Sequence, residues 1–333
     1  MSHSNTLTLY TPAGVLLKSQ PIKRAAKRLA KLGFEVTIDE AAFDKQQRFG
    51  GDDETRLNAI HRVAAAAPSV AFATRGGYGL TRLLDRIDWK LLAKSVEQGT
   101  RWVGQSDLTA LQLGLLTHAK AQSWAGPLGV DFGRSNDEGG VDDVTQDCFT
   151  EAMSGLLEAV GFRTEKGFDG LTVRGQLWGG NLCMVNSMLG TKHFPRIKGG
   201  VLFLEDINEH PYRVERSLLQ LAQAGVLDAQ KAIVLGDFGG WRESPLDRGY
   251  GLKSAIEAVR AVTKTPILTG LPFGHVDTKV CLPVGAKVDL VVQGRDVLMG
   301  WQNDPQLKHD HESHASQQPH EPHEHDAGHA HSH

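Results

Sequence analysis

Three polar residues that lie far apart in the sequence have the side-chain types of a nucleophilic relay: Ser106, Glu205 and His275. Ser106 follows a short apolar run and precedes a leucine-rich stretch with helical spacing. A serine at such a strand-to-helix turn would project its hydroxyl from the carboxyl edge of a sheet, where open α/β folds bind ligands. The next amide, on Asp107, would lie at a helix N-terminus and suit a developing oxyanion. Simple helix capping by the serine fits the same position.

The candidate acid and base are less distinctive when each is taken alone. Glu205 ends the apolar run at residues 201–204, and His275 lies in a loop rich in glycine and proline at residues 270–275. Such a loop can aim an imidazole into a cleft. A strand-end glutamate is nevertheless usually solvated, and a loop histidine usually lies at the surface. Other histidines outside the C-terminal tail are rival bases, and among these we rank His210 first because it lies between Glu209 and a proline; the others considered are His61, His118 and His193.

A glycine-rich turn, Arg75-Gly76-Gly77-Tyr78-Gly79, follows the apolar run at residues 69–73. Its glycines permit a tight turn and close approach of the backbone to a bound group, so a second oxyanion donor could come from here. A phosphate cradle is the competing interpretation. The glycine spacing matches neither G-x-G-x-x-G nor a P-loop, so we do not expect nucleotide binding.

The elements that must position these residues follow an α/β pattern in the first part of the chain. Strands are expected at residues 6–10, 34–38, 69–73 and 102–104, alternating with helices at 22–31 and 54–66, one beginning within 79–85, and one after Ser106. Turn-forming residues at 131–143 indicate a domain junction, which a helix at 149–160 would bridge. Beyond it, strands are expected at 171–178, 201–204, 232–235, 267–268 and 287–292, with few helices, the clearest at 211–224.

This pattern predicts four parts: an α/β domain at residues 1–135, a linker at 136–170, a β-rich domain at 171–305 and a disordered tail at 306–333. Nine histidines and no apolar residue larger than alanine occupy 309–333. Such a segment cannot bury enough surface to become ordered. Dense imidazoles bind divalent metals, so we expect adventitious or buffering contact with a metal there rather than a catalytic metal.

Composition limits the possible partners. The 333 residues carry a formal net charge of −3, so there is no broad basic surface for nucleic acid. The first residues do not resemble a leader peptide, and no apolar run is long enough to cross a bilayer, so we expect a soluble cytoplasmic protein. Three scattered cysteines without a Cys-x-x-Cys pair predict reduced thiols.

Over almost all of residues 6–300 the chain resembles the LD-carboxypeptidase family, also called muramoyltetrapeptide carboxypeptidase. The motifs that carry the resemblance occur in family order: Arg75-Gly-Gly-Tyr-Gly, Gly104-Gln-Ser-Asp with Thr109-Ala110, Leu177-Trp-Gly-Gly-Asn181, Leu204-Glu-Asp-Ile-Asn-Glu-His-Pro and Gly274-His275. The resemblance implies that Ser106 is the nucleophile of a triad with Glu205 and His275. It also implies an oxyanion hole formed by the backbone amides of Gly77 and Asp107.

The resemblance further implies a flavodoxin-like N-terminal domain with a parallel sheet, a C-terminal β-rich α/β domain and a homodimer. The implied activity, without a cofactor, is removal of the terminal D-alanine from murein tetrapeptides in peptidoglycan recycling. Arg75 is a candidate for binding the substrate carboxylate or for a structural ion pair, and Trp178 and Asn181 could line the cleft or form a turn and its packing partner. Two alternatives stay open: a microcin C immunity-type peptidase acting on aminoacyl or peptidyl adenylates, and a metal-buffering protein built around the tail.

Overall fold

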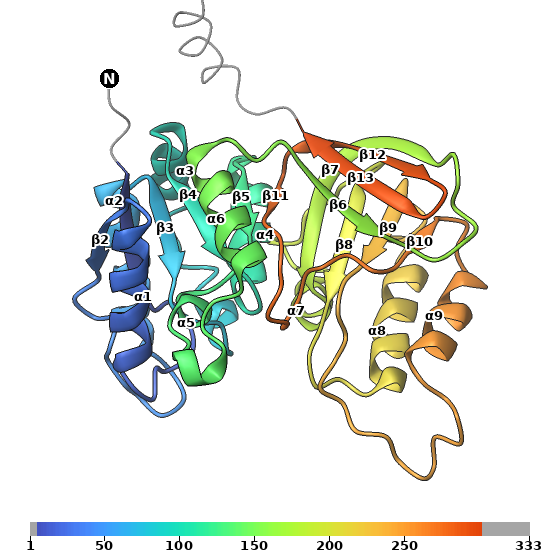
Figure 1. The fold of residues 1–333 in the computed structure, drawn as a ribbon, viewed down its shortest axis with the longest axis horizontal. Coiled ribbons are helices and arrows are strands. Elements are labelled where there is room, and N and C mark those ends of the chain that lie inside the picture. The colour runs from blue at the N-terminus through green and yellow to red at the C-terminus, as the bar shows by residue number, and fades with distance from the viewer. Residues whose placement is uncertain (1–4, 302–333) are drawn as a thin grey trace, which may run out of the picture.

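The computed structural model describes residues 5–301, which form two sheets side by side with helices packed around them (Figure 1). The predicted histidine tail lies outside the described residues. The first sheet has the order β2-β1-β3-β4-β5-β11. Its strands are β1 (Thr6–Tyr10), β2 (Glu35–Ile38), β3 (Val70–Ala73), β4 (Arg101–Gly104), β5 (Ser123–Ala125) and β11 (Leu282–Val284).

The first five strands of this sheet are parallel, in the order 2-1-3-4-5 of flavodoxin-like folds, which confirms the predicted class. All four residues of β3 are buried, as expected for a parallel sheet covered on both faces. The helices of this half are α1 (Gln20–Lys31), α2 (Asp53–Ala66), α3 (Trp89–Glu97), α4 (Leu108–Ala119), α5 (Gly129–Phe132) and α6 (Asp143–Ser154).

Two predicted helix positions in this half are wrong. Residues 79–85 contain a 3-10 turn, Leu80–Arg82, and the next α-helix starts only at Trp89, where the Asp88 side chain accepts the first free N–H groups of α3. The helix expected at 149–160 instead starts after Asp142, whose carboxylate accepts the Thr145 N–H, and it ends at Gly155 in the left-handed region.

Helix α6 packs against the first sheet through an aromatic cluster. The Phe149 ring centroid lies 4.7 Å from that of Phe72 on β3 and 5.0 Å from that of Phe132 on α5. The segment predicted as a linker, 136–170, therefore contains a helix packed on the first sheet, and also β6 (Ala159–Arg163) at the edge of the second. The exact domain limits stay a prediction.

The second sheet has the order β10-β9-β8-β7-β12-β13-β6. Strands β7 (Thr172–Asn181), β8 (Val201–Glu205), β9 (Ala232–Leu235) and β10 (Ile267–Leu268) are parallel, while β12 (Lys287–Gln293), β13 (Asp296–Trp301) and β6 join β7 in antiparallel pairs. This confirms the β-rich α/β prediction. Besides the expected α8 (Pro211–Gln223), the described chain has α7 (Leu182–Met188) and α9 (Leu252–Arg260), which were not predicted.

The chain returns once from the second half to the first. Strand β11 pairs antiparallel with β5, with Leu282 opposite Ala125. The preceding loop is fixed to the first half by side chains: Lys279 Nζ lies 3.0 Å from Asp131 Oδ1, and the Thr145 hydroxyl donates to the Asp277 carbonyl at 2.8 Å. Because this loop begins at His275, the return carries that histidine toward the first sheet.

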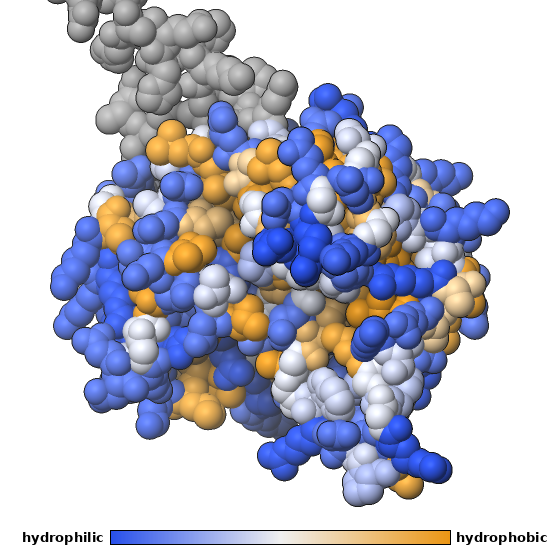
Figure 2. Space-filling view, turned by 45° about the vertical axis from the view of Figure 1, so that its right-hand side comes forward, coloured by the Kyte–Doolittle hydropathy of each residue, from blue (hydrophilic) through white to orange (hydrophobic). Residues whose placement is uncertain are grey.

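Within residues 5–301, no helix combines the length and the apolar character that a membrane span requires. Hydrophilic residues cover most of the face shown in Figure 2, and apolar residues appear there as separate patches.

Replacing Phe149 with alanine should destabilise the protein by about 3–5 kcal/mol, because the ring is fully buried and its removal leaves a cavity between α6 and the first sheet. Urea unfolding followed by far-UV circular dichroism measures the change. Leu246→Ala is the control, since Leu246 is 88% exposed and should change stability by less than about 0.5 kcal/mol. Equal effects of the two substitutions would contradict the packing described for α6.

Candidate active site

Ser106 occupies a strained turn between β4 and α4. Its φ is +64°, a left-handed value that non-glycine residues adopt rarely and that recurs in nucleophile turns between a strand and a helix. The turn lies at the carboxyl edge of the first sheet, on the strand next to β3, and the strand order reverses between β1 and β3. Ligands of doubly wound sheets bind in this region.

The glycine-rich turn packs directly against Ser106. A Cβ atom added to Gly76 would lie 2.6 Å from Ser106 Cβ and 2.7 Å from its Oγ, so only glycine fits there. The Gly76 carbonyl accepts the Gly14 N–H at 3.0 Å, which fixes the turn from its other side. Gly77 has a φ of +88°. The structure therefore brings together the turn and the nucleophile candidate, as the predicted oxyanion hole requires.

Glu205 and His275 form a partly buried acid–base pair. His275 Nδ1 lies 2.8 Å from Glu205 Oε2, and the glutamate is fully buried while the histidine side chain is 21% exposed. Burial of the imidazole lowers its pKa, but the hydrogen bond and negative charge of Glu205 outweigh this and raise the pKa of His275 above its usual 6.5. With Nδ1 donating to Glu205, Nε2 of the neutral ring is left to accept a proton.

The pair is joined to the nucleophile's helix through Asn181, the last residue of β7. The Asn181 backbone N–H donates to Thr109 Oγ1 at 3.0 Å, and the Thr109 N–H donates to the Ser106 carbonyl. The Asn181 side-chain Nδ2 donates to Glu205 Oε1 at 3.2 Å. A continuous path of hydrogen bonds thus runs from Ser106 to His275 across the two halves.

Ser106 Oγ and His275 share no direct hydrogen bond in the described part of the chain, so the structure joins the acid to the base but not the base to the hydroxyl. Catalytic bonds of this kind are often long in the free enzyme and shorten when substrate is bound. The assignment of the three residues as a triad remains a prediction, which the path through Asn181 supports.

Two further buried carboxylates border this site. Asp206 Oδ1 accepts the other bond from Asn181 Nδ2 at 2.9 Å, and its Oδ2 accepts the Cys183 N–H at 2.9 Å. Burial raises the pKa of Asp206 to about 6, against the lowering effect of these bonds. Burial likewise raises the pKa of Asp107 to about 6. The site therefore holds its negative charge away from bulk water.

The predicted substrate-binding residues differ in their surroundings. The Arg75 guanidinium donates to the Val15 carbonyl at 2.7 Å and lies beside the glycine turn. Asn181 is buried, and its side-chain groups are occupied by Glu205, Asp206 and the Met184 N–H. Trp178 is fully buried with its indole N–H donating to Gln230 Oε1 at 3.0 Å, which gives its predicted contact with substrate no support.

The rival histidines have other partners. His210 caps α8 and bonds through Nε2 to Asp247 at 3.0 Å. His118 and His193 bond to each other at 2.8 Å, and His193 bonds to Asp85. His61 accepts the Asp88 N–H. Residues 5–301 contain no cluster of three or more histidine, cysteine or acidic side chains suited to a metal.

Sequence reasoning missed two residues that hold the site together. Thr109 was noted only as part of a motif, although its hydroxyl forms the link to Asn181. Lys279 is 2% exposed and fixes the His275 loop to Asp131, and no local pattern marked it as buried.

Comparison with known proteins gives a consistent result. The sequence model of the LD-carboxypeptidase N-terminal domain matches residues 7–126, and that of the LD-carboxypeptidase C-terminal domain matches residues 174–290. A probable murein peptide carboxypeptidase of Bacillus subtilis is 29% identical over 78% of this chain and 80% of its own length. A murein tetrapeptide carboxypeptidase of Pseudomonas aeruginosa is 27% identical over 81% and 87% of the two chains.

Solved structures agree with the sequence matches. The crystal structure of muramoyltetrapeptide carboxypeptidase from Oxalobacter formigenes has a TM-score of 0.81 and 38% identity, covering 90% of this chain and 99% of that one. A microcin C7 self immunity protein in its wild-type apo state shares the fold, with a TM-score of 0.79 at 19% identity, covering 91% and 98%. Together these matches define the chain as a peptidase of the carboxypeptidase class. It belongs to the LD-carboxypeptidase family, with both domains of that family present and in order.

Replacing Glu205 with glutamine should lower the pKa of His275. The amide can still accept from Nδ1, but it has no negative charge to stabilise the imidazolium, so the effect of burial prevails. Titration of ¹⁵N-labelled histidine by NMR measures the pKa, with His275→Gln identifying the resonance. Glu257→Gln, at an exposed site on α9, should leave the pKa unchanged. An unchanged or higher pKa in Glu205→Gln would refute the pairing.

Replacing Gly76 with alanine should lower kcat roughly 100-fold or more, because the new methyl group would displace the Ser106 side chain from its position. Steady-state kinetics on a peptide substrate, with circular dichroism as a test of folding, would show it. Gly251→Ala is the matched control, since a Cβ there meets no atom within 4 Å and the backbone is extended. Activity in the alanine variant at 76 equal to that of the control would exclude close packing of the turn on the serine.

Proposed function

We propose that this protein is a serine-type LD-carboxypeptidase that removes the terminal D-alanine from murein tetrapeptides, with Ser106 as nucleophile, His275 as general base and Glu205 as its acidic partner. The observation that carries the proposal is the hydrogen-bonded Glu205–His275 pair, linked through Asn181 and Thr109 to the strained turn of Ser106. The names of the relatives, murein peptide and tetrapeptide carboxypeptidases, support the substrate class.

In the first half of the reaction, Nε2 of His275 accepts the proton of the Ser106 hydroxyl as the oxygen attacks the carbonyl of the bond to D-alanine. Glu205 holds the ring with its Nδ1 proton directed at the carboxylate and stabilises the imidazolium that forms. The developing oxyanion faces the N–H groups of Gly77 and Asp107. His275 then donates its proton to the departing D-alanine amine, and an acyl-enzyme remains.

In the second half, a water molecule takes the place of the amine. His275 accepts a proton from the water, which attacks the ester, and returns the proton to Ser106 as the shortened peptide leaves. The raised pKa of His275 sets the acid limit: turnover rises as pH increases through that pKa, because only the neutral ring can act as a base.

A carboxypeptidase must also bind the terminal carboxylate of its substrate. Arg75 is our candidate, because its guanidinium uses one N–H group for the Val15 carbonyl and lies beside Gly14 and Gly77. We assign Asn181 a different role, holding Glu205 in place, since its side chain is already fully bonded. The proposed setting is peptidoglycan recycling in the cytoplasm by a homodimer, as the family resemblance implies.

The alternative of a microcin C immunity-type peptidase rests on likeness of fold alone, at 19% identity, and no feature of the site favours an adenylate over a peptide. The alternative of a metal-buffering protein depends on the tail, which lies outside the described residues.

Ser106→Ala should lower the release of D-alanine from a murein tetrapeptide by roughly four to six orders of magnitude, as removal of a triad serine does in other peptidases. D-Alanine is measured by a coupled D-amino acid oxidase assay on purified protein. Ser187→Ala, at an exposed serine of α7, serves as control and should retain full activity. The absence of D-alanine release by the unmodified protein, or its persistence in Ser106→Ala, would overturn the proposal.

A further inference from the structure

The Asp107 side chain behaves unusually for its position. Asp107 is the N-cap of α4, where an aspartate commonly accepts an N–H bond from the first turn of its own helix, yet it makes no such bond. Its Oδ2 instead accepts the backbone N–H of Leu80 at 2.8 Å, in the segment that follows the glycine turn. The residue that contributes one proposed oxyanion donor is thus fixed by its side chain to the residue that directly follows the turn contributing the other.

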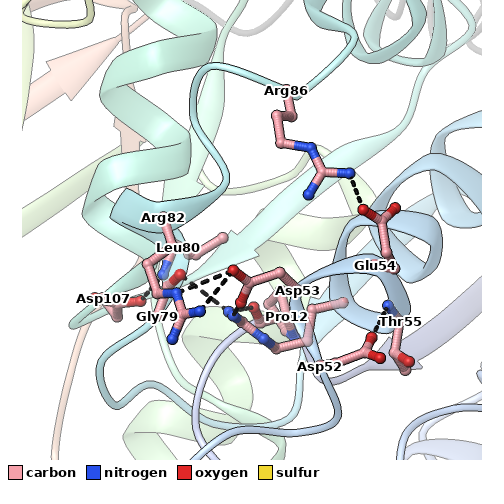
Figure 3. A network of polar contacts seen from close by, with 11 residues as sticks. Pro12, Asp52, Asp53, Glu54, Thr55, Gly79, Leu80, Arg82, Arg86 and Asp107 are labelled. Atoms are coloured by element: carbon pink, nitrogen blue, oxygen red, sulfur yellow. Dashed lines mark hydrogen bonds and ion pairs between the residues drawn. The ribbon is translucent and has the colours of Figure 1, made fainter.

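Arg56 binds the other polar group of the peptide between Gly79 and Leu80, the Gly79 carbonyl. Its guanidinium is fully buried and donates to the Gly79 carbonyl at 3.0 Å and to the Pro12 carbonyl at 3.2 Å. Figure 3 shows Asp107 beside Gly79 and Leu80, within the network of polar contacts that also includes Asp53. The peptide group between Gly79 and Leu80 therefore bonds to an arginine through its C=O and to an aspartate through its N–H. Gly79 must be glycine here, because a Cβ would lie 2.6 Å from the guanidinium.

These contacts complete the anchoring of the glycine turn. The turn is fixed at its start by the bond between the Gly76 carbonyl and the Gly14 N–H, and at its end by the Gly79–Leu80 peptide. Gly77 lies between the two anchors. The position of its N–H relative to that of Asp107 therefore depends on both.

We propose that the side chains of Asp107 and Arg56 are positioning residues of the oxyanion hole, which hold the Gly79–Leu80 peptide between them and so keep the N–H of Gly77 opposite the N–H of Asp107. This inference rests on the proposed function. It assigns Asp107 two separate tasks, one for its backbone and one for its carboxylate.

Burying the Asp107 and Arg56 side chains with polar atoms left unbonded is destabilising, which indicates that these side chains have a specific role. Asp107 Oδ1 and Arg56 Nε are buried without a hydrogen-bond partner among residues 5–301, and burial raises the pKa of Asp107 to about 6. The two charges form no direct ion pair in the described chain; Arg56 pairs with Asp53, at 2.5 Å. A buried, incompletely bonded carboxylate is destabilising, so its presence is explained best by the peptide it holds.

Asp107→Asn and Asp107→Ala test the aspartate as a matched pair. The amide oxygen of asparagine can still accept the Leu80 N–H while its NH₂ group takes the place of Oδ1, so kcat should fall less than about 5-fold. Alanine removes the acceptor, and kcat should fall roughly 100-fold, as on loss of one oxyanion donor, with KM changing less than about 3-fold. A peptide boronic acid, whose tetrahedral adduct on Ser106 carries the oxyanion, should lose affinity in parallel with kcat.

Arg56→Lys and Arg82→Lys test the arginine. Both arginines pair with Asp53 and lie over the Phe49 ring, but of the two it is Arg56 that bonds to the Gly79 carbonyl. The single nitrogen of lysine at 56 cannot occupy the positions of both guanidinium nitrogens, of which one bonds to the two carbonyls and the other to Asp53, so kcat should fall about 10-fold or more while KM is retained. Arg82→Lys should keep the activity of the unmodified protein. Thermal melting of every variant measures folding separately.

The outcomes separate this inference from the proposed function. If Ser106→Ala abolishes D-alanine release but Asp107→Ala keeps kcat within 3-fold, the positioning role is wrong and the function stands. If Asp107→Asn is as damaging as Asp107→Ala, the negative charge rather than the acceptor matters, and the inference is also wrong. The positioning role is supported if Asp107→Ala lowers both kcat and the affinity for the boronic acid while KM stays nearly constant, and if Asp107→Asn restores both. Activity in Ser106→Ala removes the basis of both.

Discussion

The hydrogen bond from the Asn181 backbone to the Thr109 hydroxyl is the constraint on which the arrangement of the site depends. Thr109 lies on the first turn of the nucleophile's helix, and Asn181 ends the strand that runs beside β8 and its terminal Glu205. A proton relay tolerates displacements of only about 0.5 Å. The two halves of the chain must therefore meet with side-chain precision, and Gly180 allows this because a Cβ there would lie 2.4 Å from Thr109 Oγ1.

The contact between the two halves is polar rather than apolar around Asn181 and Glu205. Glu205 accepts from Asn181 through one oxygen and pairs with His275 through the other, and Asp206 is bonded to Asn181, Cys183 and its neighbour Ile207. A buried polar network with its partners satisfied fixes one geometry, whereas apolar packing tolerates sliding. The cost of burying these charges is offset locally by hydrogen bonds, which is why their positions are so closely linked.

Much of this fold follows from local sequence, because a parallel sheet covered on both faces leaves apolar runs separated by helical periodicity. The positions of the first four strands and the strand-to-helix turn at Ser106 were accessible in this way, whereas the flavodoxin-like arrangement of the sheet was implied by the family resemblance. The helix starts at Asp53, Trp89 and Asp143 depend on single capping aspartates, and two of those positions were misjudged. Local patterns also failed for β11, which has three residues and gains its partner from a strand more than 150 residues earlier.

In the site, too, some residues could be predicted from the sequence and others could not. The identities of Ser106, Glu205 and His275 came from residue types and family motifs, but the roles of Asn181 and Lys279 depend on contacts between distant segments. An asparagine after two glycines is as typical of a turn as of a support for a carboxylate. Asn181 does both, since its Oδ1 caps α7, but its support of Glu205 depends on the pairing of β7 with β8, which no local pattern shows.

Strand β11 gives the molecule an architecture in which covalent order and spatial order disagree. The chain builds the first sheet, begins the second, inserts one strand back into the first beside β5, and then completes the second with β12 and β13. Neither lobe is therefore a self-contained module that recombination could exchange between proteins. A gene fragment ending before residue 282 would leave β5 as an open sheet edge, ready to pair with other chains.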